Sequence, residues 1–165
     1  QTYAVSPIAW GTTNAAKYVS AIPAVPEGGT DANSSMTAAI NALKSSGASE
    51  NNRNKSTEAD IQSDKGNGSV SRYIVLMTDG EMTGNSANFN RSLDQSVRDK
   101  CDTAKKDGIQ IFTVAFMAPD TGKSLLNYCA SDSSYYYEPE DMEDLVSAFG
   151  EIAEKAAKAT TRLTN

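Results

Sequence analysis

The sequence predicts an α/β fold of three layers, with helices on both faces of a mainly parallel sheet. Two apolar, β-branched segments, Tyr73–Met77 and Ile109–Phe116, flank a segment, 89–104, in which apolar residues recur every three or four positions. A strand, a helix and a second strand in this order form a right-handed parallel crossover. The first strand is apolar throughout, which is typical of a central strand covered on both faces.

Size and charge set the broad class. The chain has 165 residues, of which 39% are hydrophobic, and a net charge of -6, so residues 1–165 suffice for one domain with a packed core. No apolar run approaches the roughly 20 residues that a membrane-spanning helix needs. Lysines and arginines are scattered, so we expect no nucleic-acid partner. The chain starts at Gln1 without a signal segment, which favours a processed product or an excised piece.

The N-terminal half is predicted to hold two helices between irregular segments. Residues 2–10 are rich in strand formers but contain a proline, which indicates an edge strand. Apolar spacing predicts helices over Asn14–Ile22 and Ser34–Leu43, with a turn-rich loop at 26–31 before the second. Residues 45–71 are almost entirely polar, and we expect a flexible insertion there.

The C-terminal half is predicted to alternate helices and strands. The helix over 89–104 is expected to end at Gly108, where a left-handed cap fits. A short helix over Lys123–Cys129, a short strand over Tyr135–Tyr137 and a closing helix over Glu140–Ala157 follow. The predicted inward face of the closing helix consists of Met142, Leu145, Val146, Phe149, Ile152 and Ala156.

Oxygen-bearing side chains follow the first predicted strand. Thr78, Asp79, Gly80 and Glu81 lie at its carboxyl end, where open parallel sheets bind ligands. With the hydroxyl of Thr30 from a neighbouring loop, these groups would be hard oxygen ligands suited to Mg²⁺ or Ca²⁺. The alternative is structural: Asp79 caps a turn and Thr30 caps the following helix.

The only two cysteines are Cys101 and Cys129, and the chain contains no histidine. From composition alone, a disulfide and two free buried thiols are both open. Two cysteines without histidine cannot complete a structural zinc site. The absence of histidine also excludes nucleophilic catalysis by a Ser–His or Cys–His pair within this chain.

Three segments together carry a resemblance to a known family. Gly28-Gly29-Thr30, then Ile74 to Glu81 with its Thr-Asp-Gly-Glu sequence, then Cys101 to Phe116 resemble, in order and spacing, successive blocks of a von Willebrand factor A domain. The resemblance implies a Rossmann-like three-layer fold whose N-terminal strands are missing from this chain. It also implies a binding module and no enzymatic activity.

The closing part of the chain resembles a narrower group. Leu125 to Ser131, the tyrosine run, Leu145 to Ile152 and Thr161 to Thr164 are similar to the C-termini of bacterial TadG-like proteins of Tad-type pilus assembly. That resemblance implies a module in the periplasm or at the cell surface, anchored to the membrane in the full-length protein. A location outside the cytoplasm in turn favours a disulfide between Cys101 and Cys129.

The wider family builds a metal-ion-dependent adhesion site from three loops. The resemblance implies that Thr30 is a direct ligand of Mg²⁺ (or Ca²⁺ or Mn²⁺) and that Asp79 holds metal-bound water or a ligand hydroxyl. An acidic side chain of a protein partner would complete the coordination, and the rim would consist of Gly29, Asp31, Gly80 and Glu81.

The first loop of that site, an Asp-x-Ser-x-Ser sequence, is absent. The nearest string, residues 31–35, lies in the position of the second loop and has asparagine in place of the first serine. Either the first loop lies upstream, on a fragment of the same domain, or the site has been lost. Loss would leave a metal-free structural scaffold, and a third, weaker alternative is a hydrolase in which Asp79 and Glu81 hold Mg²⁺.

Overall fold

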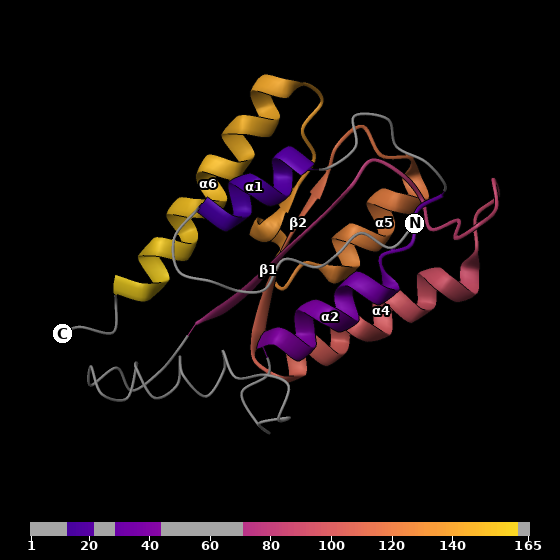
Figure 1. Cartoon of the computed structure of the whole chain (residues 1–165), viewed down its shortest axis with the longest axis horizontal. Coiled ribbons are helices and arrows are strands. Elements are labelled where there is room, and N and C mark those ends of the chain that lie inside the picture. The colour runs from indigo at the N-terminus through magenta and orange to yellow at the C-terminus, as the bar shows by residue number, and fades with distance from the viewer. Residues whose placement is uncertain (1–12, 22–28, 44–70, 162–165) are drawn as a thin grey trace.

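The computed structural model describes residues 13–21, 29–43 and 71–161 (Figure 1). The predicted edge strand at 2–10 and the insertion at 45–71 lie outside the described residues, apart from residue 71. In chain order the elements are α1 (Thr13–Ala21), α2 (Asn33–Leu43), β1 (Arg72–Thr78), α4 (Arg91–Lys106), β2 (Ile109–Ala115), α5 (Asp120–Cys129), the 3-10 helix η1 (Ser133–Tyr135), β3 (Tyr136–Tyr137) and α6 (Met142–Thr161).

The described strands form one parallel sheet in the order β1-β2-β3. All seven residues of β1 pair with β2, from Arg72 opposite Ile109 to Thr78 opposite Ala115. Helices lie on both faces of this sheet, so the predicted three-layer α/β architecture is confirmed. The strand–helix–strand unit that the sequence predicts corresponds to β1, α4 and β2.

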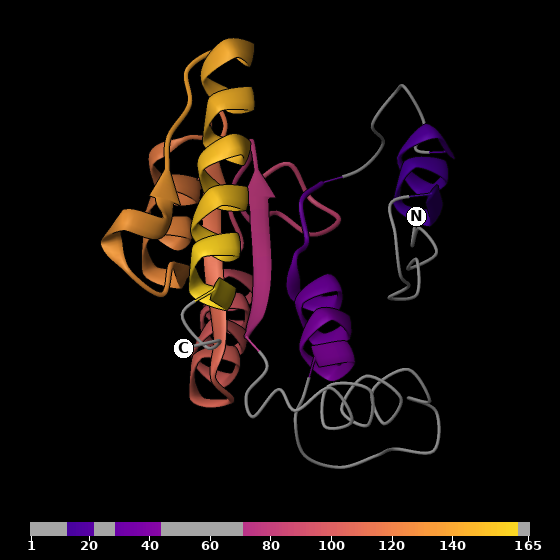
Figure 2. The ribbon, with the colours of Figure 1, turned by 90° about the vertical axis from the view of Figure 1, so that its left-hand side faces the viewer.

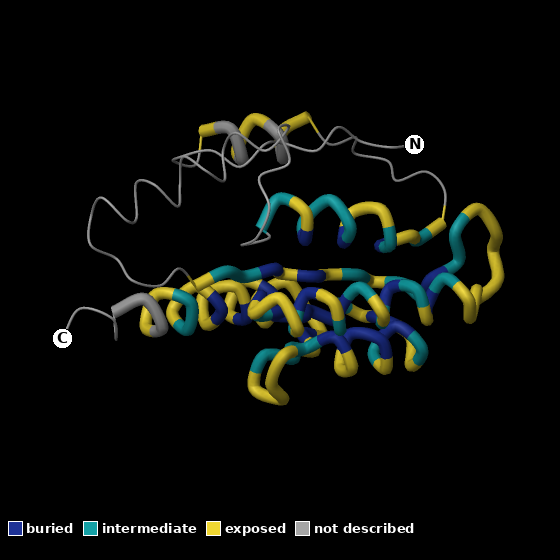
Figure 3. The backbone as a smooth tube through the Cα atoms, turned by 90° about the horizontal axis from the view of Figure 1, so that it is seen from below, coloured by how far each residue is buried: buried dark blue, intermediate teal, exposed yellow. Residues whose placement is uncertain are grey.

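One face of the sheet is covered by α2, α4 and α5. Alternate strand residues, among them Ile74, Leu76 and Ile111, pack with Met36 of α2 and Val97 of α4 in a single cluster. Figure 3 shows the buried positions concentrated where these helices meet the strands. The alternation follows from the geometry of a strand, in which successive side chains point to opposite faces.

The opposite face is covered by α6. Phe112 and Val114 of β2 are fully buried against Leu145 and Ile152 of this helix. The Lys155 ammonium donates to the Tyr137 hydroxyl at 2.8 Å, so one flank of α6 is held against β3. The tyrosine run therefore contributes to the core, as an alternating short strand would.

The α4 helix begins later than its sequence pattern predicts. Asn90 caps it, because its side chain accepts from the Leu93 N–H at 3.0 Å. Phe89 consequently lies before the helix and is partly exposed, contrary to the predicted helix over 89–104. At the other end, the predicted cap is confirmed, since Gly108 adopts a left-handed conformation with φ 74°.

The closing helix differs most from its prediction. It begins at Met142, and its buried residues include Leu145, Ala148 and Ile152. The predicted inward residues Met142, Val146 and Phe149 are 63%, 68% and 42% exposed. The prediction was wrong for these three because apolar spacing identifies a broad stripe, whereas the described sheet beneath the helix covers only part of it.

The β1 strand is also less covered than predicted. It lies at one edge of the described sheet, and Val75 and Met77 are 42% and 41% exposed. The sequence predicts a strand covered on both faces. Among the described residues, only the face of β1 toward α2 and α4 is covered.

Within the described ranges, no helix combines the length and apolar character that crossing a membrane requires.

Candidate metal centre

Three loops meet at the carboxyl end of β1 and β2. They are residues 29–31 before α2, residues 79–84 after β1, and the start of α5. Thr30 is paired with the second loop in a parallel bridge to Met82, and its carbonyl accepts from the N–H groups of Thr83 and Gly84, both at 3.0 Å. The Thr30 N–H donates to the Thr83 hydroxyl at 3.0 Å. The backbone of Thr30 is thus fixed from both sides.

Glycines allow these loops to approach one another closely. A Cβ atom placed on Gly80 would lie 2.9 Å from the Thr30 hydroxyl oxygen, and one placed on Gly122 would lie 2.6 Å from the Gly80 carbonyl oxygen. A side chain at Gly122 would collide with the Gly80 backbone, and one at Gly80 would displace the Thr30 hydroxyl. Gly29 lies against Thr83 and Gly84 on the same side. Of the predicted residues, Gly80 therefore lies against Thr30, and Asp79 precedes Gly80 in the chain.

The structural roles that the sequence left open for Thr30 and Asp79 are filled by other residues. The Gly80 N–H in the turn after β1 donates to the Thr78 hydroxyl at 3.1 Å. The N–H of Asn33, the first residue of α2, donates to the Asp31 carboxylate at 2.8 Å. The Asp31 carboxylate thus closes a turn just before α2, while Asp79 is exposed.

Glu81 is held across the site. Its carboxylate accepts a 2.6 Å hydrogen bond from the hydroxyl of Thr121 in the first turn of α5. This bond ties the loop after β1 to the N-terminal end of α5. The hydrogen bond holds the Glu81 carboxylate against the start of α5.

The donor set fits part of a divalent cation site. The hydroxyl of Thr30 and the carboxylate of Asp79 are hard oxygen donors on adjoining loops, because Gly80, the residue after Asp79, lies against Thr30. No group of three or more histidine, cysteine, aspartate or glutamate side chains in the described part of the chain could hold an ion. These residues therefore supply at most part of a coordination sphere.

Sequence reasoning missed two residues that organise this site, Thr83 and Thr121. Each acts through a hydrogen bond to a residue far away in the chain, across 53 positions for Thr83 and 40 for Thr121. No local pattern carries such a signal. Both become apparent only once the loops are placed side by side.

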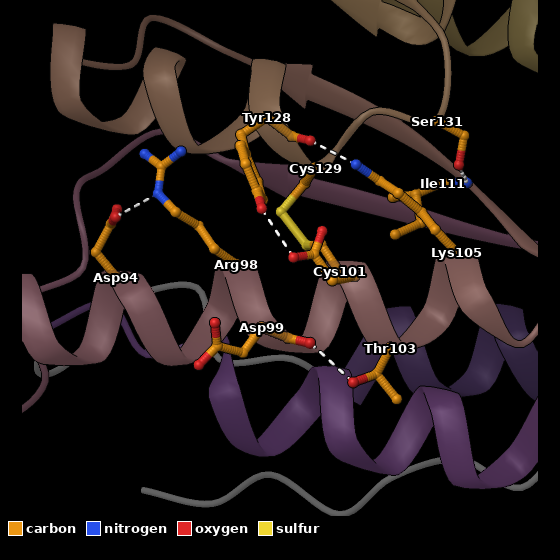
Figure 4. The surroundings of a disulfide bond; sticks show 11 residues. Asp94, Arg98, Asp99, Cys101, Thr103, Lys105, Ile111, Tyr128, Cys129 and Ser131 are labelled. Atoms are coloured by element: carbon orange, nitrogen blue, oxygen red, sulfur yellow. Dashed lines mark hydrogen bonds and ion pairs between the residues drawn. A yellow bond between two sulfur atoms is a disulfide. The ribbon is translucent and has the colours of Figure 1, made fainter.

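On the face covered by α4 and α5, Cys101 and Cys129 form the predicted disulfide, and both residues are fully buried (Figure 4). The Tyr128 ring lies beside it, with the Arg98 guanidinium 4.9 Å and the Lys105 ammonium 5.1 Å from the ring centre. Lys105 also donates to the Tyr128 carbonyl at 2.6 Å. The bridge and these contacts join α4 to the end of α5.

Two ionisable groups of this cluster have shifted pKa values. Burial lowers the pKa of the Lys105 ammonium, and the nearby Asp102 carboxylate partly opposes this effect. The hydrogen bond from the Tyr128 hydroxyl to Asp102 raises the pKa of Tyr128. Both shifts reflect structural contacts between α4 and α5, and neither group lies near the three loops.

With the geometry in place, comparison with known proteins decides the family. A family model described as the von Willebrand factor type A domain matches residues 15–151. The chain belongs to this family. Domains of this family are generally adhesion modules that mediate protein–protein interactions and are not enzymes.

Other comparisons add little. Among solved structures, a match is proximal thread matrix protein 1 from the mussel byssus, with 19% sequence identity and a TM-score of 0.41. The match covers 53% of this chain and 20% of the mussel chain. None of the curated proteins compared with the chain matches it.

Proposed function

We propose that this chain is the C-terminal part of a von Willebrand factor A domain that binds a protein partner at the bacterial cell envelope, in Tad-type pilus assembly. The observation that carries the binding mode is the close approach of Gly80, the residue after Asp79, to the Thr30 hydroxyl on two interlocked loops. Thr30 would ligate Mg²⁺, Ca²⁺ or Mn²⁺ directly, and Asp79 would orient metal-bound water. The Asp-x-Ser-x-Ser loop upstream of this chain would supply the remaining ligands.

The bound ion would supply an open coordination position for an acidic side chain of the partner. The chain's own residues contribute the geometry around that position. Thr83 fixes the Thr30 backbone, and the bond from Thr121 keeps Glu81 on the rim. Gly29, Asp31 and Gly80 complete the rim.

The disulfide supports the proposed location. Bridges of this kind persist in oxidising compartments such as the periplasm and the cell surface and are rare in the cytosol. Location outside the cytoplasm, with a membrane anchor elsewhere in the full-length protein, therefore suits this chain.

The test is calorimetric titration of Mg²⁺, Ca²⁺ and Mn²⁺ into the intact protein, including any sequence that precedes Gln1. A double variant, Thr30→Ala with Asp79→Ala, is expected to lose at least about tenfold in affinity, because removing direct or supporting ligands has effects of this size. Glu151→Gln is the control, since it removes one exposed negative charge from the middle of α6, an element that takes no part in the three loops. Its affinity should stay close to that of the unaltered protein.

A metal-free scaffold is the second candidate function. The observation that favours it is the lack of a three-residue ion-holding group in the described ranges, together with the absent first loop. No heat of binding with any of the three ions, in either the unaltered protein or the double variant, would establish the scaffold and overturn the adhesion site.

A further inference from the structure

A cavity of about 400 Å³ lies at the amino end of β2, and its walls include Gly108 and Ile109. The three loops of the candidate metal centre lie at the other end of the sheet, at the carboxyl ends of β1 and β2; Figure 2 shows β1 lengthwise, with its carboxyl end at the top. Sites for small molecules have volumes of about 300 to 1,000 Å³. The cavity is near the lower end of this range, so it suits a small ligand.

The walls of the cavity are tied to one another. The Ile111 N–H donates to the Ser131 hydroxyl at 2.8 Å, and the Ser131 N–H donates to the Ile111 carbonyl at 3.0 Å, so the segment after α5 is fixed to β2 (Figure 4). On the α4 side, the Lys105 ammonium donates to the Tyr128 carbonyl at 2.6 Å. The disulfide joins the same two helices. A ligand therefore meets walls that are already ordered, which lowers the entropic cost of binding.

Two groups of opposite charge, Lys105 and Asp132, line the cavity. No ion pair joins them in the described part of the chain. The ammonium has three N–H groups, of which one donates to Tyr128. The Asp132 carboxylate has about four acceptor positions, of which the Ser134 N–H occupies one at 2.8 Å. That N–H also lowers the pKa of Asp132, so the carboxylate is ionised at neutral pH. Both charges retain the capacity to bind a ligand.

Gln110 adds a further pair of donors to the cavity wall. The Tyr135 hydroxyl donates to the Gln110 amide oxygen at 3.2 Å, which fixes the orientation of the amide. Within the described residues, the amide nitrogen has no hydrogen-bond partner. Lys105 and Gln110 thus supply N–H donors that suit a carboxylate, whereas Asp132 supplies acceptors that suit an ammonium.

Other classes of small ligand fit these walls less well. A purely anionic ligand such as phosphate would be repelled by Asp132, and a purely cationic ligand would be repelled by Lys105. A neutral sugar would need a free aromatic face. The Tyr135 ring stacks on Phe112, with 4.1 Å between ring centres, and the Lys155 ammonium lies 5.8 Å from the Tyr135 ring centre. A ligand that carries both charges matches the cavity best.

We propose that this cavity binds a dipeptide in its zwitterionic form. The ligand's carboxylate accepts from Lys105 and Gln110, and its ammonium donates to Asp132. Lys105 and Asp132 are too far apart to pair with each other, so the two ligand charges must also be separated, as they are at the two ends of a dipeptide. None of these groups belongs to the three loops. The site is therefore independent of the proposed cation site.

The test titrates the dipeptide alanylalanine into the intact protein in the presence of the chelator EDTA. Proton–nitrogen correlation NMR follows the backbone amides of Gly108, Gln110 and Ser131, which line the cavity. N-acetyl-alanylalanine lacks the ammonium, and alanylalanine amide lacks the carboxylate. Each is expected to bind at least about threefold more weakly than the dipeptide, which is the effect of losing one solvent-accessible charge contact.

An Asp132→Asn variant assigns the ammonium contact. Asparagine keeps a side-chain oxygen that can accept from the Ser134 N–H, so the start of η1 stays capped while the charge is removed. The variant should bind the dipeptide at least about threefold more weakly and should no longer distinguish it from the N-acetyl derivative. Lys106→Gln is the control: it removes an exposed charge from the last turn of α4, outside the cavity wall, and should leave dipeptide affinity unchanged.

Three results would overturn the proposal. The first is that alanylalanine shifts none of the three cavity amides up to its solubility limit. The second is that both blocked derivatives bind the unaltered protein as tightly as the dipeptide, which means that the walls do not recognise the charged ends. The third is that Asp132→Asn still prefers the dipeptide over its N-acetyl derivative by the same factor. EDTA removes divalent cations throughout, so failure of the proposed cation site leaves these readouts unchanged.

Discussion

The two long strands, β1 and β2, are alike in sequence but differ in how completely they are covered. Both are apolar on both faces, and they pair along their whole length. Nearly every residue of β2 is buried, with helices on both faces and strands on both edges, whereas β1 alternates buried and exposed residues. An apolar sequence therefore predicts that a strand lies in the sheet, but it does not predict how far each face of that strand is buried. Burial depends on the helices and strands that lie next to it.

The largest expected effect on stability concerns the disulfide between α4 and α5, the helices that cover one face of β2. Replacing Cys101 and Cys129 together by alanine removes the bridge between α4 and α5, and we expect unfolding free energy to fall by about 3 to 4 kcal/mol. The physical reason is that the bridge restricts the unfolded chain across 28 residues of sequence separation. Urea unfolding of the intact protein, with and without the substitutions, measures the change.

Ser92→Ala on the exposed face of α4 serves as the control and should alter stability little. A double cysteine variant as stable as the unaltered protein would mean that packing between α4 and α5, including the Tyr128 contacts, suffices without the bridge.

The fold of this covered side was predictable from local pattern. The β1-α4-β2 unit follows from two apolar runs, a helical repeat and a glycine at the helix end, and all of these are encoded within about 45 residues of one another. The disulfide was not predictable from composition. It followed from the family resemblance and the compartment that the resemblance implies.

The second expected effect compares two neighbouring residues of α6, of which one is buried against the sheet and the other is exposed. Leu145→Ala should destabilise the protein by about 2 to 4 kcal/mol, because Leu145 is buried against β2. Val146→Ala removes a side chain that is 68% exposed and should cost less than about 0.5 kcal/mol if that surface faces water. Denaturant unfolding of both variants gives the two values side by side.

The cost of Val146→Ala shows whether the exposed flank of α6 is in contact with water in the intact protein. A cost near that of an ordinary surface substitution would mean that the flank of α6 is solvated. A cost above about 1 kcal/mol would mean that Val146 is buried in the intact protein.

The candidate site was only partly predictable. Thr30, Asp79 and Gly80 could be placed at one end of the sheet because the carboxyl ends of parallel strands meet there. The organising roles of Thr83 and Thr121 could not, because each depends on a bond between loops distant in sequence. The face of α6 was mispredicted for a related reason: helical spacing does not say how wide a sheet lies underneath.

The smallest expected effect on stability concerns an ion pair next to β3. The Lys123 ammonium pairs with the Glu138 carboxylate, which also accepts from the Tyr136 hydroxyl at 2.8 Å. The pairing with Lys123, followed by the bond from Tyr136, lowers the pKa of Glu138, and the same pairing raises the pKa of Lys123. Because the folded pKa of Glu138 is depressed, its contribution to stability is present above the ordinary glutamate pKa and is lost as pH falls through the folded value.

A Glu138→Gln variant should therefore melt slightly below the unaltered protein at neutral pH. The difference should be smaller near pH 3, below the ordinary glutamate pKa, and should vanish only once the pH lies below the depressed pKa of Glu138. Added salt should shrink the difference at neutral pH, because the pair is accessible to solvent. Melting temperatures at the two pH values, read by circular dichroism, provide the measurement. A difference that is the same at both pH values would mean that Glu138 stabilises the β3 region by packing or neutral hydrogen bonding. Its charge would then play no part in joining α5 to the segment after β3.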